Sequence, residues 1–285
     1  SVGDYALFAG GDRGGSNRTN VVNAYNTSLT RSTPIALSAS RSRLAGASVG
    51  NYALFAGGYD GTDNYFRTVD AYNTSLTRST PIGLTVARYN LAGASVGAYA
   101  LFAGGYTYPG TGSGNYFNVV EAYNTSLTRS TPTALSVARG NLAGASVGAY
   151  ALFAGGANGG AVVDAYNTSL TRSTPTALSA SRSSLAGASI GDYALFAGGS
   201  GTSNVVDAYN TSLTHSTPTA LSVARSRLAG ASIGDYALFA GGDTSSDPSN
   251  VVDAYNTSLT RSTPTASSSA RYSLAAASVG AYALF

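Results

Sequence analysis

Arginines and acidic residues recur along the chain at positions where their charges could meet. Guanidinium and carboxylate groups form charge-assisted hydrogen bonds, which fix geometry as well as adding energy. The arginines are Arg41, Arg88, Arg139, Arg182, Arg225 and Arg271, and the acids are Asp70, Glu121, Asp164, Asp207 and Asp253, with Asn23 at the corresponding place in the first repeat. Because a residue present in every repeat usually serves the repeat itself, we expect these side chains to pair within or between repeats. A lining that presents the arginines to an anionic ligand is the alternative.

A second series of arginines contains the single histidine of the chain. Its members are Arg31, Arg78, Arg129, Arg172 and Arg261, with His215 in the remaining place. One imidazole without a cysteine or a second histidine makes a poor metal site, because metals in proteins are held by several such ligands. We therefore interpret His215 as drift at an exposed outer position, and we predict no metal site and no cofactor.

Tyrosines gather in two of the segments that differ between repeats. Variable loops on a rigid scaffold are where binding usually resides, and tyrosine offers a flat ring with a hydroxyl that suits sugars or protein partners. The candidate ligand-binding residues are Tyr59, Asp60, Tyr65, Arg67, Tyr106, Tyr108 and Tyr116. The alternative is that Tyr65-Phe66 and Tyr116-Phe117 extend a strand into the core, since aromatic residues favour strands.

The residue types that enzymes need are scarce in this chain. With no cysteine and one histidine, cysteine nucleophiles and copper centres are excluded, and a Ser-His-Asp set has no supporting feature. The Gly-Gly pairs follow expected strands without opening helices, so they are not phosphate-binding loops. We predict no catalytic residues and no enzyme activity. A carbohydrate-processing enzyme with an acid pair in a central channel is the weaker alternative.

The charge of the chain is low and evenly spread. Charged residues make up 10% of the 285 residues, the formal net charge is +3, and all 16 basic residues are arginines. Since most of them recur at fixed repeat positions, they do not form the basic face that phosphate binding needs, and we expect no nucleic-acid partner. Because no apolar run approaches the length of a bilayer span, we also expect no membrane insertion.

An Asn-Thr-Ser tripeptide occurs in every repeat and satisfies the sequence rule for N-glycosylation. The asparagines are Asn26, Asn73, Asn124, Asn167, Asn210 and Asn256, and Asn17-Arg18-Thr19 is an additional match. The same residue types are a turn signal. We favour an unmodified turn, with glycosylation as the alternative.

The side chains described above are positioned by the repeating unit of the sequence in which they lie. The motif Tyr-Ala-Leu-Phe begins at Tyr5, Tyr52, Tyr99, Tyr150, Tyr193, Tyr236 and Tyr282, at spacings of 43 to 51 residues, the size of a four-stranded propeller blade. In one unit, 193–196 is expected to form a strand with two apolar faces, and 205–209 a second strand. The run 213–223 suits a short outer strand and loop, because its proline cannot donate to a sheet. The small residues of 228–232 suit the place nearest a propeller axis.

These residues resemble the kelch family. The matching features are the double glycine after the Tyr-Ala-Leu-Phe strand, the Val-x-x-Tyr strand and an arginine before the innermost strand, and they cover essentially the whole chain. The resemblance implies an all-β fold, a six-bladed kelch-like β-propeller of four-stranded antiparallel blades. Kelch blades usually carry a tryptophan in the fourth strand, whereas this chain has none. We expect one leucine of each repeat to take that packing role: Leu29, Leu76, Leu127, Leu170, Leu213 and Leu259.

We predict one propeller domain over residues 1–285. Its repeats run approximately over 1–47, 48–94, 95–145, 146–188, 189–231 and 232–277, followed by a partial extra strand at 278–285. The ring is expected to close when Leu274 to Val279 supplies the inner strand of the blade begun by Tyr5 to Ala9, because joining both ends in one sheet hides its edges. Residues 281–285 are then surplus, and self-association through them is an expected partnership.

The sequence favours a non-enzymatic binding scaffold that presents variable loops on one propeller face to a protein or glycan ligand. A loose likeness to kelch arrays of bacterial surface and phage tail proteins suggests adhesion and favours an extracellular, cell-surface or virion-associated location. The alternative function is a structural building block, whose near-identical blades and surplus strand serve a fibre, a swapped oligomer or a designed scaffold.

Overall fold

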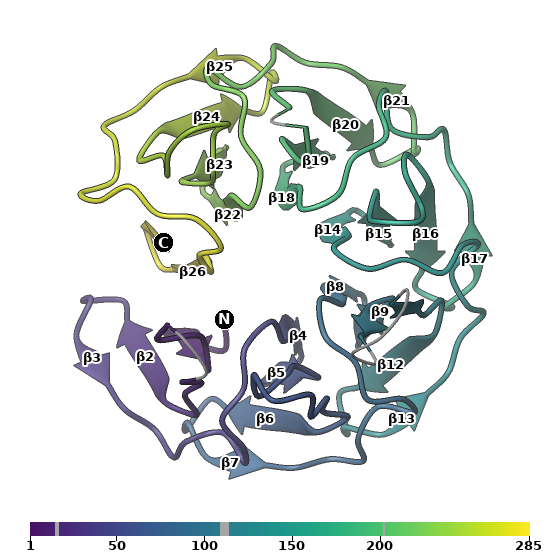
Figure 1. Cartoon of the computed structure of the whole chain (residues 1–285), viewed down its shortest axis with the longest axis vertical. Coiled ribbons are helices and arrows are strands. Elements are labelled where there is room, and N and C mark those ends of the chain that lie inside the picture. Colours follow the sequence, from purple (N-terminus) through teal and green to yellow (C-terminus); the bar gives the residue numbers. More distant parts are fainter. Residues whose placement is uncertain (15–16, 109–113, 202) are drawn as a thin grey trace.

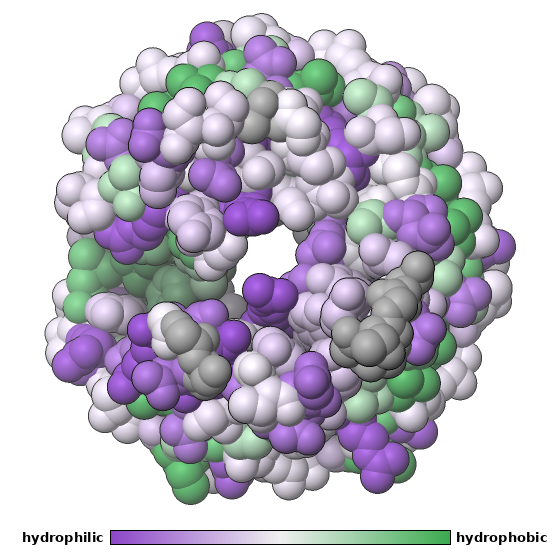
Figure 2. All heavy atoms as spheres, in the orientation of Figure 1, coloured by the Kyte–Doolittle hydropathy of each residue, from purple (hydrophilic) through white to green (hydrophobic). Residues whose placement is uncertain are grey.

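A computed structural model describes residues 1–14, 17–108, 114–201 and 203–285. Within these ranges the chain forms antiparallel strands, turns and no helix. Six sheets stand like propeller blades around a central opening, which passes through the molecule (Figures 1 and 2). The predicted all-β, six-bladed fold is confirmed. In the same described ranges, no helix could cross a membrane.

The blades follow one another in chain order (Figure 1). Blade one contains β1 (Tyr5–Ala9), β2 (Val22–Asn26) and β3 (Arg31–Ser32), and blade two contains β4 (Ala45–Val49), β5 (Tyr52–Ala56), β6 (Val69–Asn73) and β7 (Arg78–Ser79). Blade three contains β8 (Ala92–Val96), β9 (Tyr99–Ala103), β12 (Val120–Asn124) and β13 (Arg129–Ser130), with a small hairpin of β10 (Tyr106–Thr107) and β11 (Asn115–Tyr116) in its loop.

The second half of the ring repeats this plan. Blade four contains β14 (Ala143–Val147), β15 (Tyr150–Ala154), β16 (Val163–Asn167) and β17 (Arg172–Ser173). Blade five contains β18 (Ala186–Ile190), β19 (Tyr193–Ala197), β20 (Val206–Asn210) and β21 (His215–Ser216), and blade six contains β22 (Ala229–Ile233), β23 (Tyr236–Ala240), β24 (Val252–Asn256) and β25 (Arg261–Ser262). A last hairpin pairs β26 (Ala277–Val279) with β27 (Tyr282–Leu284).

The hydrophobic core lies between the blades. In β15, Leu152 is fully buried against blade five, and its neighbour Phe153 is fully buried against blade three. The Phe153 ring also meets the edge of the Tyr166 ring in β16, with centroids 6.0 Å apart. The Tyr166 hydroxyl donates to the carbonyl of Thr133 in the neighbouring blade, at 2.8 Å. The strand sequence is therefore apolar on both faces because each sheet is covered on both faces.

Glycine is required where the inner strands converge. A Cβ on Gly144 would lie 2.4 Å from the carbonyl oxygen of Gly93, and one on Gly187 would lie 2.4 Å from that of Gly144. No side chain tolerates such a contact with backbone. The observed inner strand β22 confirms that the small residues 228–232 lie nearest the axis.

A ring of seven serines runs around the axis through the inner strands. Its members are Ser1, Ser48, Ser95, Ser146, Ser189, Ser232 and Ser278, and each neighbouring pair shares a hydrogen bond. The hydroxyl of Ser95, for example, donates to the carbonyl of Ser48 at 2.7 Å. Six members belong to the six blades and the seventh belongs to β26. The β26–β27 hairpin therefore occupies a seventh place in the ring, between blade six and blade one (Figure 1).

The expected closure of the ring is wrong in its strand pairing. β26 pairs with β27, where Val279 lies opposite Tyr282, and does not join β1. In blade one, Val2 takes the inner place through a bridge to Tyr5. Both are local hairpins with two-residue turns, which cost less entropy than pairing the two ends of the chain. The ends still meet, because the hydroxyl of Ser1 donates to the carbonyl of Ser278 at 2.6 Å.

The outer strand of each blade is only two residues long. In blade five it is β21, and the expected start of this segment, Leu213, lies instead in the preceding turn with a φ of 61°. The corresponding Leu170 packs against the core between blades three and four. Five of the six leucines therefore contribute to packing between blades, as expected, but from a turn and not from the fourth strand: Leu76, Leu127, Leu170, Leu213 and Leu259. The expectation is wrong for Leu29, which is 39% exposed.

Candidate functional site

The tyrosine-bearing loops of blades two and three lie beside each other at the same end of the strands. Each loop leaves the second strand through the double glycine; Gly57, with a φ of 69°, approaches the carbonyl of Arg88 so closely that a Cβ would lie 2.6 Å away. Tyr59 then bridges to Tyr65 within its own loop. In blade three, Tyr106 lies opposite Tyr116 in the β10–β11 hairpin. Tyr65 and Tyr116 therefore fold back over their loops and do not extend the third strand into the core.

Five tyrosines form a continuous row across the two loops, which we call the tyrosine row: Tyr59, Tyr65, Tyr89, Tyr106 and Tyr116. The rings of Tyr59, Tyr65 and Tyr89 stack on one another, with centroids 5.3 to 5.6 Å apart. Tyr89 also meets Tyr106 at 4.3 Å, and Tyr106 meets Tyr116 at 5.4 Å. Tyr89 is only 5% exposed, and the other four tyrosines are half-buried, so a ligand would reach the row through these four.

Tyr89 is the central member of the row and was not a predicted site residue. It comes directly after Arg88, one of the six arginines that recur before the inner strands and that we call the ring arginines, and it bridges to Tyr106. The corresponding residue is Ser42 in blade two and Gly140 in blade four, so Tyr89 departs from small residues. That departure, beside a loop rich in tyrosine, is the sequence signal that could have identified it.

Guanidinium groups lie over the row at two places. The Arg18 guanidinium is 5.6 Å from the Tyr59 ring centroid, and the Arg43 guanidinium is 5.7 Å from that of Tyr89. Arg18 also pairs with Asp12 at 2.8 Å. Burial, with a hydrogen bond to Tyr106, raises the pKa of Tyr89, so its hydroxyl stays protonated. The row thus combines hydroxyl groups with nearby positive charge.

The other predicted loop residues have separate roles. Asp60 accepts hydrogen bonds from the backbone of Thr62 at 2.8 Å and the side chain of Asn64 at 2.7 Å. Desolvation opposes ionisation of Asp60, but these hydrogen bonds outweigh it and lower its pKa, so Asp60 fastens its own loop as a carboxylate. Arg67 is exposed. Tyr108 is 46% exposed, and its backbone N–H donates to the Tyr65 hydroxyl at 3.1 Å, which links the two loops.

Five ring arginines pair with acids of their own blades, as expected from their recurrence. The pairs are Arg41–Asp70, Arg88–Glu121, Arg139–Asp164, Arg182–Asp207 and Arg225–Asp253. Arg139 and Asp164 are 2.8 Å apart and both fully buried. Burial lowers the pKa of Arg139 despite the attraction of Asp164. Desolvation would raise the pKa of Glu121, but hydrogen bonds and charge from Arg88 and hydrogen bonds from Thr85 lower it overall. These ion pairs therefore stabilise blades two to six and are not presented to an anionic ligand.

His215 replaces an arginine that contacts the acid of its blade. In blade four, Arg172 lies 3.0 Å from Asp164, and in blade five the Nε2 atom of His215 lies 2.6 Å from Asp207. The histidine side chain is only 16% exposed. Its interpretation as drift at an exposed position is therefore wrong, because it contributes to a buried ionic cluster. Within the described ranges, no group of three or more potential metal-ligating side chains occurs.

The two ends of the series of ion pairs are exceptions. Arg271 precedes β26 and is exposed, and it forms no ion pair with any described residue. Asn23 occupies the acid position of blade one, opposite Phe8, and is half-buried. Among the described residues of blade one, which contains Asn23, there is no ring arginine. A neutral amide at position 23 avoids burying a carboxylate without a partner.

The asparagines of the glycosylation sequons organise turns at the opposite end of the strands. The Oδ1 atom of Asn73 accepts hydrogen bonds from the backbone of Ser75 at 3.0 Å and Thr77 at 2.9 Å. The pattern recurs at Asn26, Asn124, Asn167, Asn210 and Asn256. This arrangement supplies a structural reason for the recurrence of the tripeptide. Glycosylation of these residues stays a prediction to be tested.

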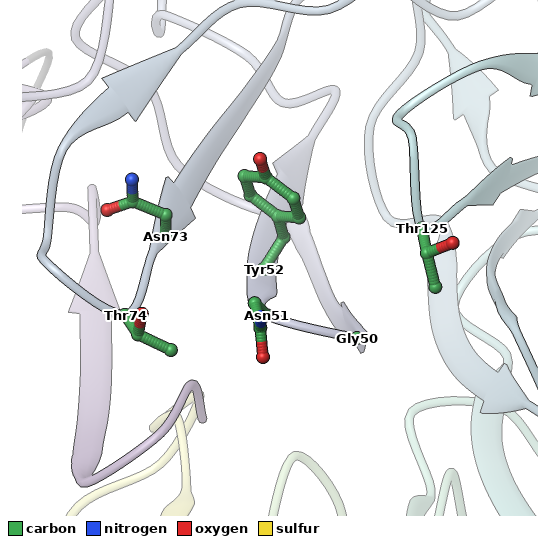
Figure 3. Close-up of a pocket in the computed structure, with 6 residues that line it drawn as sticks. All are labelled: Gly50, Asn51, Tyr52, Asn73, Thr74 and Thr125. Carbon is green, nitrogen blue, oxygen red and sulfur yellow. The ribbon is translucent and has the colours of Figure 1, made fainter.

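A shallow pocket of about 470 Å³ lies at this opposite end, between blades two and three (Figure 3). Its lining comes from the β4–β5 turn, with Gly50, Asn51 and Tyr52, from Asn73 and Thr74 at the end of β6, and from Thr125 of blade three. Gly50 approaches Thr125 closely, since a Cβ would lie 3.0 Å from its methyl group. These are repeated turn residues, so the pocket reflects the spacing of the blades.

Comparison with known proteins supports the architecture. No family model matches the chain, and no curated protein matches it. Among solved structures the chain is similar to that of YjhT, with 12% sequence identity, a TM-score of 0.68, and coverage of 90% of this chain and 96% of that chain. At this identity the likeness shows the fold alone. The chain is thus a six-bladed β-propeller built from sequence repeats.

Proposed function

We propose that the protein is a non-catalytic interaction scaffold that binds a protein or glycan ligand through the tyrosine row on blades two and three. The observation that carries this proposal is the row itself: five tyrosine rings in contact, four of them on the two irregular loops and the fifth, Tyr89, between those loops. Packing between the blades explains the repeated tyrosines, such as Tyr166, but it does not require those of the variable loops.

The chemistry of the row favours a ligand rich in hydrogen-bond acceptors. Stacked rings are held rigidly, so binding them loses little side-chain entropy. Tyrosine hydroxyls donate and accept, and Arg43 adds an exposed positive charge beside Tyr89. Sugar hydroxyls, carboxylated sugars and polar protein surfaces all meet this description. Rigid aromatic residues flanked by arginine are also the side chains that contribute most to protein interfaces.

The experiment has two steps. The chain is screened against a glycan array and a displayed protein library, and the affinity of each ligand found is then measured for Tyr59→Ala and Tyr106→Ala. Each variant should weaken binding by about tenfold or more, as expected for a buried aromatic contact residue.

Tyr272→Ala is the matched control, because Tyr272 holds the repeat position of Tyr89 but lies away from the row, beside Arg227. It should bind as the parent does. Ligands whose affinity is unchanged in both Tyr59→Ala and Tyr106→Ala would contradict the proposal, as would a ligand that depends equally on Tyr272.

A further inference from the structure

An arc of backbone hydrogen bonds borders the central opening at the end of the blades that carries the variable loops. It links residues that lie two places before the inner strands: Arg43, Asn90, Asn141, Ser184 and Arg227. From Asn90 onward, each backbone N–H donates to the carbonyl of the preceding member, at 2.8 to 3.0 Å. All five residues have a φ between 52° and 56°, so each blade presents its side chain from the same backbone geometry. We call these five residues the rim.

The rim is polar and contains no acidic residue. Its two arginines are exposed, and its other three members are half-buried. Figure 2 shows hydrophilic residues around the central opening. Arg227 lies 3.7 Å from Asp243, whereas Arg43 makes no ion pair with any described residue. The rim therefore presents positive charge together with neutral groups that donate and accept hydrogen bonds.

Two side-chain contacts join the rim to the tyrosine row. The guanidinium of Arg43 lies over the Tyr89 ring, 5.7 Å from its centroid. The side-chain amide of Asn90 donates to the Tyr106 hydroxyl at 3.3 Å. Tyr89 and Tyr106 also bridge to each other through their backbones. The rim and the tyrosine row are therefore one continuous surface, which runs from the loops of blades two and three to the mouth of the central opening.

The charges on this surface favour an anionic ligand. Two acids beside the tyrosine row are already engaged, since Asp12 pairs with Arg18 at 2.8 Å and Asp60 accepts hydrogen bonds within its own loop. Arg43 keeps its charge available at the junction of the row and the rim. A guanidinium that lies over an aromatic ring can still donate from its edge to both oxygens of a carboxylate. A ligand carboxylate would therefore supply the partner that Arg43 lacks among the described residues.

The asparagines of the rim favour a peptide over a glycan. A side-chain amide has N–H donors and a carbonyl acceptor in one plane, which matches the N–H and C=O groups of an extended peptide backbone. Among the described residues, the Asn141 side chain makes no hydrogen bond and the Asn90 side chain makes only its bond to Tyr106. Sugars usually bind aromatic residues by stacking on an open ring face. Guanidinium groups lie over the Tyr59 and Tyr89 rings, so these two offer less open face to a sugar.

We propose that the rim and the tyrosine row together bind an extended acidic peptide segment of a partner protein. A carboxylate of the segment pairs with Arg43, and its backbone amide groups form hydrogen bonds with Asn90 and Asn141. Its neighbouring side chains contact the half-buried tyrosines of the row. The charge gives selectivity for an acid, and the aromatic contacts give affinity. This inference rests on the proposed function, because it assigns a ligand class to the same tyrosines.

The test selects ligands for the whole chain from a displayed library of short random peptides and measures their affinities by fluorescence anisotropy. The selected peptides should carry aspartate or glutamate at one shared position. Replacing that acid by its amide should weaken binding about tenfold, as should Arg43→Gln in the protein. With both changes together the losses should not add, because the two groups contact each other. Asn141→Ala should weaken binding about fivefold, as expected for the loss of one hydrogen bond.

Arg31→Gln is the control protein, because Arg31 is an exposed arginine on the outer strand β3, away from the rim. It should bind each peptide as the parent does, which separates Arg43 from the general charge of the chain. A library that yields no binding peptide overturns the inference, and so do peptides whose affinity is unchanged in Arg43→Gln. A glycan or a neutral peptide that needs Tyr59 and Tyr106 but not Arg43 also overturns it and leaves the proposed function intact. Peptides that need neither tyrosine contradict both.

Discussion

Replacing Asp164 by asparagine should destabilise the protein far more than an ordinary charge change. Asp164 and Arg139 are fully buried and 2.8 Å apart, and the Nε and Nη1 atoms of Arg139 have no hydrogen-bond partner among the described residues. The Asp164→Asn change leaves the Arg139 guanidinium with its desolvation cost and without its carboxylate. Removing one member of a buried pair costs about 3–5 kcal/mol. For a chain of this size that corresponds to a fall in Tm of roughly 6–10 °C.

The assay is calorimetric and chemical unfolding of three variants. Asp192→Asn is the control, because Asp192 is exposed, and it should stay within about 0.5 kcal/mol of the parent. Arg139→Met combined with Asp164→Leu removes both charges and should recover most of the lost stability. The reasoning is refuted if Asp164→Asn costs no more than the control, or if the double variant is as unstable as the single one.

Three further outcomes are expected. Gly144→Ala should cost about 1–3 kcal/mol or more in unfolding experiments, because its Cβ would meet the carbonyl of Gly93 at 2.4 Å, whereas Gly46→Ala should be tolerated because its nearest contact is 3.7 Å away. The pKa of Glu121 is lowered in the fold, so the stabilisation that its carboxylate contributes is present above its unfolded pKa of about 4.3 and is lost as the pH falls through its folded pKa. Between pH 5 and pH 2, the unfolding free energy of Glu121→Gln should therefore fall less than that of the parent protein. Asn73→Ala removes the acceptor of two backbone N–H groups and should cost about 1 kcal/mol in urea unfolding, and unchanged stability would contradict the turn role.

The blade could be predicted from sequence because each of its signals is local. Tyr-Ala-Leu-Phe alternates two apolar faces, the double glycine ends the strand, and the crowded inner strands near the axis admit only small residues such as the Ala-Gly-Ala-Ser of 229–232. The run 213–223 was predicted as a short outer strand and a loop, and the structure has a strand of two residues there, His215–Ser216. The exact bounds of that strand depend on contacts outside the segment. The predicted closure of the ring was wrong because Val279 and Tyr282 lie opposite each other in a local hairpin. The number of repeats does not show whether a strand pairs with its neighbour in sequence or with the other end of the chain.

The candidate site was predictable only in part. Recurrence indicated that Arg139 and Asp164 meet, since a repeat brings both to the same place in every blade. The tyrosines of the variable loops were found from their composition, but their stacking depends on loops of two neighbouring blades and on Tyr89, which lies 24 residues from Tyr65 in sequence. His215 was misread because its burial follows from the length of its side chain and the position of Asp207, neither of which a single strand reveals.

Each ring arginine and its acid lie within one repeat length of each other, only 25 residues apart for Arg139 and Asp164. Duplication or deletion of one repeat therefore carries both charges together and never separates a buried ion from its partner. Blade number in such a chain can change in steps without an electrostatic penalty at the new junctions. In the first and last members of the described series, Asn23 is neutral and Arg271 is exposed, so neither places an unpaired charge in the interior.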